Sequence, residues 1–105
     1  MSNRFSVTMH KTENHVVIGL QGDLDLAAAG EFRAHMEPIV NDSTIELTLD
    51  LERLTYIDST GIGILISILK VRHGMQSPFH IINVPQYVQK LFKMTGISKF
   101  LTPTA

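Results

Sequence analysis

The sequence predicts an α/β fold, a mixed sheet of four to five strands with its helices packed on one face. Three segments alternate apolar and polar residues, which is typical of strands that are buried on one side and solvated on the other. Helical patterns separate the later strands, and strand–helix–strand units favour parallel neighbours. Strands covered on both faces would be continuously apolar, so the alternation places all the helices on one side.

The first half of the chain predicts a hairpin followed by a helix. Residues 5–10 and 16–21 alternate, and the stretch KTEN at 11–14 is expected to form the turn between them. Residues 26–40 then place apolar side chains near one helical face, although Pro38 weakens the pattern.

The second half predicts two strands and two helices. The clearest alternation is IELTLDLE at 45–52, and residues 78–84 indicate a shorter strand. Residues 59–74 and 85–96 are predicted helices, each closed by a glycine, and the second begins with a proline at a first-turn position.

Composition limits the classes of function. The 105 residues are expected to form one domain, 1–105. Nine basic and ten acidic residues give no electrostatic footprint for nucleic acid or an anionic membrane. Cysteine is absent, which removes thiol chemistry, and no signal peptide or membrane-spanning segment is apparent. We expect a cytoplasmic protein that is a monomer when free.

The stretch YIDSTGIGIL at 56–65 contains the strongest candidate site. Ser59 and Thr60 are good N-cap residues for the following helix, and Asp58 adds a carboxylate at its positive end. Capping is the commonest use of such residues. A hydroxyl at a helix start is also a good place to carry a phosphate, and Gly61 keeps the approach to Ser59 open.

The sequence does not match the catalytic and metal-binding motifs that these residues suggest. The glycines after Ser59 lack the third glycine of the dinucleotide fingerprint, and Ser59 lacks the preceding glycine of a nucleophile elbow. The five histidines are scattered, and Asp23 and Asp25 are more typical of turn or cap residues than of a cation site. We expect no enzymatic activity, no cofactor and no metal.

The helix at 59–74 carries two apolar stripes. Ile62, Leu65, Ile66 and Leu69 suit the sheet, whereas Ile64 begins a second stripe, nearly opposite. The second stripe either packs against neighbouring helices or leaves its first part exposed as a docking surface beside Ser59. We expect Ile64, and also Asp25, to be exposed.

Three blocks of sequence resemble the STAS domains of the anti-sigma factor antagonist family. DLERLTYIDSTGIGILISILK at 50–70 resembles the family signature, in which a strand leads to Asp-Ser-(Ser/Thr)-Gly and a helix. GDLDLAAAGEF at 22–32 is similar to its Gly-x-Leu-Asp block. INVPQYVQKLFKMTGISKFL at 82–101 is similar to its closing segment.

The resemblance implies partner switching. An unphosphorylated antagonist binds an anti-sigma factor that is also a serine kinase, and so frees the sigma factor. Phosphorylation by the kinase ends binding, and a PP2C-type phosphatase restores it. The family's phosphoacceptor matches Ser59, and its kinase-facing aspartate matches Asp25; Asp58, Thr60, Gly61 and Ile64 complete the expected partner surface.

Other functions remain open on sequence grounds. The chain could be a scaffold STAS domain in a larger signalling complex, or a partner-switching regulator of a target other than a sigma factor. An enzyme with Ser59 as nucleophile lacks a histidine that the sequence places as its base. A receiver domain phosphorylated on Asp58 lacks the acidic pair at the end of its first strand.

Overall fold

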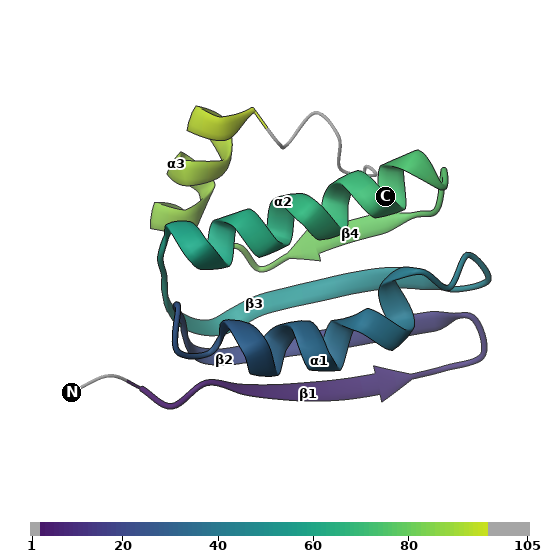
Figure 1. The fold of residues 1–105 in the computed structure, drawn as a ribbon, viewed down its shortest axis with the longest axis horizontal. Coiled ribbons are helices and arrows are strands. Elements are labelled where there is room, and N and C mark those ends of the chain that lie inside the picture. The colour runs from purple at the N-terminus through teal and green to yellow at the C-terminus, as the bar shows by residue number, and fades with distance from the viewer. Residues whose placement is uncertain (1–2, 97–105) are drawn as a thin grey trace.

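A computed structural model describes residues 3–96 of the chain (Figure 1). The elements in chain order are β1 (Ser6–Lys11), β2 (His15–Leu24), α1 (Ala29–Val40), β3 (Glu46–Ile57), α2 (Ser59–Gly74), β4 (Phe79–Ile82) and α3 (Gln86–Thr95). The predicted order of strands and helices is confirmed. The last residues of the predicted closing segment, from position 97 on, lie outside the described part of the chain.

The four strands form one mixed sheet in the order β1-β2-β3-β4. β1 pairs antiparallel with β2, and the pairing of Lys11 with Val16 closes the predicted hairpin. β2, β3 and β4 run parallel, because a helix crosses over between each pair. Figure 1 shows α1 and α2 lying over one face of this sheet. The mixed sheet and its one-sided helical cover confirm the predicted fold class.

The core lies between the sheet and the helices. The inward rows of the two central strands are at most 1% exposed: Val16, Ile18, Leu20, Leu47, Leu49 and Leu51. Phe32, Met36, Leu65 and Leu69 cover them from α1 and α2. Met9 is 52% exposed although its row begins with the buried Phe5, because β1 is the edge strand and its second half leaves the core.

The second apolar stripe of α2 is buried where it begins, so the exposed docking surface predicted at Ile64 is wrong. Ile64 is only 2% exposed and, with Met36 and Val40 of α1, lines the hollow between the two helices. α1 therefore covers the start of the second stripe, whereas Val71 further along it is 38% exposed. On the first stripe Ile66 is half-buried rather than fully covered by the sheet.

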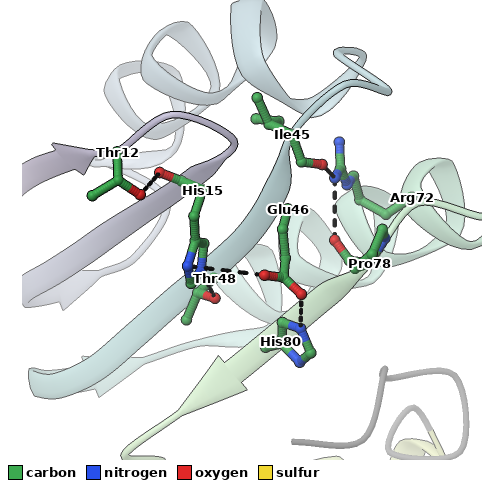
Figure 2. Close-up of polar contacts among 8 residues, drawn as sticks. All are labelled: Thr12, His15, Ile45, Glu46, Thr48, Arg72, Pro78 and His80. Atoms are coloured by element: carbon green, nitrogen blue, oxygen red, sulfur yellow. Dashed lines mark hydrogen bonds and ion pairs between the residues drawn. The ribbon is translucent and has the colours of Figure 1, made fainter.

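A buried arginine joins the end of α2 to the connection between α1 and β3. The Arg72 guanidinium donates hydrogen bonds to the main-chain carbonyls of Val40, Asp42, Ile45 and Pro78, at 2.6 to 3.1 Å. Figure 2 shows the bonds to Ile45 and Pro78. Arg72 thus fixes the end of the sheet opposite Ser59, where β3 and β4 begin.

Among residues 3–96, none of the helices has the length and apolar character needed to cross a lipid bilayer.

Candidate functional site

The predicted site residues gather where the parallel strands end. The carboxyl ends of β2 and β3 meet at one edge of the sheet, at the left in Figure 1, together with the starts of α1, α2 and α3. In open parallel sheets this edge commonly carries ligand and partner sites. The structure therefore brings Asp25, which follows β2, next to Asp58 and Ser59, which follow β3.

Asp58, and not Ser59, caps α2. The Asp58 carboxylate accepts a hydrogen bond from Gly61 N–H at 3.0 Å, and Ser59 is the first helical residue. The expected N-cap placement of Ser59 is wrong by one residue. Asp58 fills the position because its carboxylate reaches the free N–H groups and complements the helix dipole. The Ser59 side chain is consequently exposed, whereas Thr60 is half-buried.

Position 61 requires a glycine because the main chain of β2 comes very close to it, in addition to the open approach to Ser59 that the sequence suggests. A Cβ at Gly61 would lie 2.6 Å from the Leu24 carbonyl oxygen and 2.7 Å from a side-chain carbon of Ile57. The start of α2 therefore sits directly against the end of β2. Gly63, two residues further along α2, has open space where a Cβ would lie.

The two aspartates of the GDLD block have different structural roles. Asp23 belongs to β2 rather than to a loop, and its buried carboxylate accepts hydrogen bonds from Thr55 Oγ1 at 2.6 Å and Asn3 N–H at 3.0 Å. Asp25 is half-buried rather than fully exposed, and its Oδ1 accepts from Ala28 N–H at 3.1 Å. Asp25 is thus the turn residue that the sequence predicts, and Asp23 is an anchor for the N-terminal segment.

The site also contains exposed apolar and aromatic residues that the sequence did not single out. Leu26 is 73% exposed in the loop after β2, and Tyr56 is half exposed at the end of β3. Tyr87, at the start of α3, is 40% exposed. Burial raises the pKa of its hydroxyl, and the charges of Asp23 and Tyr56 raise it further. The helical pattern of residues 26–40 predicts a buried side chain at Leu26, so no signal in the sequence indicates this exposure.

This edge of the sheet carries charges of both signs, since Arg4 of the N-terminal segment lines the same hollow as Asp23, Asp25 and Glu31. Residues 21–32 and 54–69 contain Asp23, Asp25, Glu31 and Asp58, and neither stretch contains a lysine or arginine.

The histidines lie away from Ser59. On the open face of the sheet, His15 Nε2 lies 2.8 Å from Thr48 Oγ1, and His80 Nε2 lies 3.1 Å from a Glu46 carboxylate oxygen (Figure 2). Within residues 3–96, no group of three histidine, aspartate or glutamate side chains is arranged to hold a metal ion. The described contacts give Ser59 no histidine base.

The chemistry that this arrangement supports is the presentation of one hydroxyl, that of Ser59, to solvent or to a partner protein. Ser59 Oγ is accessible at the first position of a four-turn helix, beside free main-chain N–H groups and next to a carboxylate that is already engaged. A phosphate attached there would lie where helix N–H groups and the helix dipole favour an anion.

Comparison with known proteins finds one domain family over most of the chain. Residues 7–103 match the family model described as "Mlab, STAS domain". The anti-sigma-B factor antagonist of Staphylococcus aureus is 29% identical over 80 residues, which cover 76% of this chain and 74% of the relative.

Solved structures share the fold. An anti-sigma factor antagonist from Mycobacterium paratuberculosis superimposes with a TM-score of 0.82 at 21% identity, covering 96% of this chain and 87% of the other. The Bacillus cell fate determinant SpoIIAA in its phosphorylated form gives 0.73 at 22% identity, covering 95% and 92%. At these identities the likeness concerns the fold.

Proposed function

The chain belongs to the STAS domain family, and on this basis we propose that it is an anti-sigma factor antagonist that works by partner switching. Unphosphorylated, it binds an anti-sigma factor that is also a serine kinase, and the kinase then releases its target. The target is a sigma factor or another regulator held in the same way. The whole chain acts as one STAS domain, monomeric when free and located in the cytoplasm.

The observation that supports this proposal best is the exposed Ser59 hydroxyl at the start of α2. It occupies the acceptor position of the family signature, and a curated relative bears the name anti-sigma-B factor antagonist. Thr60, the neighbouring hydroxyl, is half-buried and less accessible to a kinase.

Phosphorylation switches the protein off. The Ser59 oxygen forms a bond to the γ-phosphorus of ATP, the bond from that phosphorus to the β–γ bridging oxygen breaks, and ADP leaves. The hydroxyl proton passes to a base of the kinase. A PP2C-type phosphatase hydrolyses the ester and restores binding. The partner surface then comprises Asp25, Asp58, Ser59 and Thr60, with Gly61 buried against the end of β2 behind them. Ile64, which α1 covers, is not part of this surface.

The experiment is incubation with ATP and candidate serine kinases, followed by intact mass and phosphopeptide mapping. We expect one added phosphoryl group on Ser59, its removal by a PP2C-type phosphatase, and no reaction of Ser59→Ala. Ser67→Ala, at an exposed serine further along α2, is the matched control and should react like wild type. Modification mapped to Thr60 or Asp58 would reject Ser59 as the acceptor.

A further inference from the structure

Asp58 makes a second contact that capping does not need. One carboxylate oxygen, Oδ1, caps α2 through Gly61 N–H, and the other, Oδ2, accepts a hydrogen bond from Leu26 N–H at 3.2 Å. The Asp58 main-chain N–H donates to the Leu24 carbonyl at 3.3 Å. Asp58 therefore connects the start of α2 to residues 25–28, which we call the 25–28 loop.

The 25–28 loop carries the most exposed large apolar side chain near Ser59. Leu26 is 73% exposed, although its main-chain N–H is held by Asp58. The rest of the loop is a tight turn, in which Ala28 N–H donates to both the carbonyl and the side chain of Asp25. The turn fixes the loop internally, and the bond from Leu26 N–H to Asp58 ties the residue that carries this side chain to the start of α2.

We infer that Asp58 is a positioning residue, through which phosphorylation of Ser59 reaches the 25–28 loop and changes the presentation of Leu26 to the partner. This inference rests on the proposed function and adds a mechanism of regulation to it. Leu26 is the apolar anchor that the partner buries, and Asp58 holds it beside Ser59 in the unphosphorylated protein.

The mechanism follows from charge and from the supply of N–H donors. A phosphoserine at position 59 carries about 1.5 to 2 negative charges and is adjacent in sequence to the Asp58 carboxylate. Both groups compete for the same helix N–H groups, of which Gly61 N–H is already bound by Asp58. The phosphate has more charge and more acceptor oxygens, so it displaces the carboxylate. Leu26 N–H then loses its partner, and the fold of the core is unaffected.

Asp58→Asn separates capping from positioning. Asparagine is also a good N-cap residue, so its single oxygen can keep the bond to Gly61 N–H. Its side-chain nitrogen cannot accept the bond from Leu26 N–H. The variant should therefore resemble the phosphorylated protein at the 25–28 loop while keeping α2 capped.

The test uses the full chain alone, with amide hydrogen exchange read by NMR. We compare wild type, Asp58→Asn, and protein made with phosphoserine at position 59. In both altered proteins the Leu26 amide should exchange at least about threefold faster, while amides of the core strands stay as protected as in wild type. Unchanged exchange at Leu26 in the phosphoserine protein would overturn the inference. So would a loss of protection spread over α2, which would indicate a structural role for Asp58.

A binding experiment tests the role of Leu26. With the kinase that phosphorylates Ser59, Leu26→Ala and Asp58→Asn should each weaken binding by at least about tenfold, and the double variant should be little worse than either. Met9→Ala, an exposed apolar residue on β1 away from the site, is the control and should bind like wild type. Full additivity of the two substitutions would contradict positioning of Leu26 by Asp58.

The proposed partner-switching function and the proposed coupling of Ser59 to Leu26 can be rejected independently of each other. If no kinase modifies Ser59 but Leu26 exchange responds to Asp58→Asn and to phosphoserine, the coupling stands and the partner-switching function is wrong. If Ser59 is phosphorylated and Leu26 does not respond, the function stands and the coupling is wrong.

Discussion

At the scale of single residues, Arg72 shows how a charged side chain can be structural. Its side chain is fully buried, and burial lowers the pKa of the guanidinium from its usual value. Four main-chain carbonyls at the end of α1, in the following connection and before β4 accept its hydrogen bonds. The Pro78 carbonyl also accepts a hydrogen bond from Leu47 N–H at 3.2 Å, and the guanidinium adds donors to all four carbonyls where α1 ends and where β3 and β4 begin.

We predict that Arg72→Ala lowers the free energy of unfolding by about 3 to 5 kcal/mol, because it opens a cavity and leaves buried carbonyls without donors. The exposed Lys70, two residues earlier on α2, provides the control, and Lys70→Ala should change stability by less than about 0.5 kcal/mol. Urea unfolding followed by circular dichroism measures both. Equal stability of the two variants would mean that Arg72 does not organise this end of the sheet.

A pH effect is expected at Asp42. Hydrogen bonds from the Thr44 hydroxyl and N–H lower the pKa of the Asp42 carboxyl below its ordinary value of 3.8. A lowered pKa in the folded state means stability that is present above about pH 4 and is lost as the pH falls through the folded pKa. Thr44→Ala should raise the pKa of Asp42 in an NMR titration. Thr95→Ala, on α3, should leave it unchanged.

Which residue caps and which residue is buried could be predicted only in part. Asp, Ser and Thr all cap helices, so the stretch Asp58-Ser59-Thr60 indicates a helix start without fixing its first residue. Arg72 and Asp23 have no local signal, since their burial depends on carbonyls and donors from distant segments. Leu26 fits a helical pattern, but the chain forms a turn there and leaves it exposed.

At the scale of elements, the junction of β2 with α2 makes the two glycines of the signature unequal. Gly61→Ala should destabilise the protein, because its Cβ would meet the Leu24 carbonyl and Ile57, and main chain cannot move away cheaply. Gly63→Ala should stabilise it by about 0.5 to 1 kcal/mol, as expected for glycine to alanine in an open helical position. Melting temperatures of the pair provide the comparison, and the same sign for both would contradict the close approach.

The packing of α1 on α2 predicts a large effect at Ile64. Ile64→Ala should cost about 2 to 5 kcal/mol, the usual range for a buried isoleucine. Val71, on the same stripe, is 38% exposed, and Val71→Ala should cost clearly less. Guanidinium unfolding of both variants is the measurement. A negligible effect at Ile64 would restore the exposed-patch hypothesis that the structure contradicts.

The elements themselves were largely predictable, because their signals are local. Alternation indicates β1 and β2, apolar stripes indicate α2, and Pro85 and Gly96 mark the ends of α3. The extension of β3 from Arg53 to Ile57 has no such signal, because the exposed pairs Glu52–Arg53 and Thr55–Tyr56 break the alternation. The ladder with β2 holds this segment as a strand. A helical wheel also cannot say which neighbour covers a second stripe.

At the scale of the whole molecule, the site and the core occupy different places. The core lies along the middle of β2 and β3, whereas Ser59 lies beyond their carboxyl ends. Charge added at Ser59 therefore meets solvent, the helix start and a bound partner before it meets packed side chains. Under the proposed function, this separation lets phosphorylation of Ser59 change binding while the fold persists.

We therefore predict that Ser59→Asp, an imperfect mimic of phosphoserine, weakens binding to the kinase partner without unfolding the protein. A carboxylate at the first position of α2 is favourable to the helix dipole, so the melting temperature and circular dichroism spectrum should stay close to wild type. Ser59→Ala should bind but escape inactivation by ATP, and it should change stability little because Asp58 provides the cap. Ser67→Asp, an exposed serine further along α2, controls for added charge and should bind nearly as wild type. Wild-type binding by Ser59→Asp would count against a switch located at the helix start, and a collapsed melting temperature would point instead to a conformational change through the core.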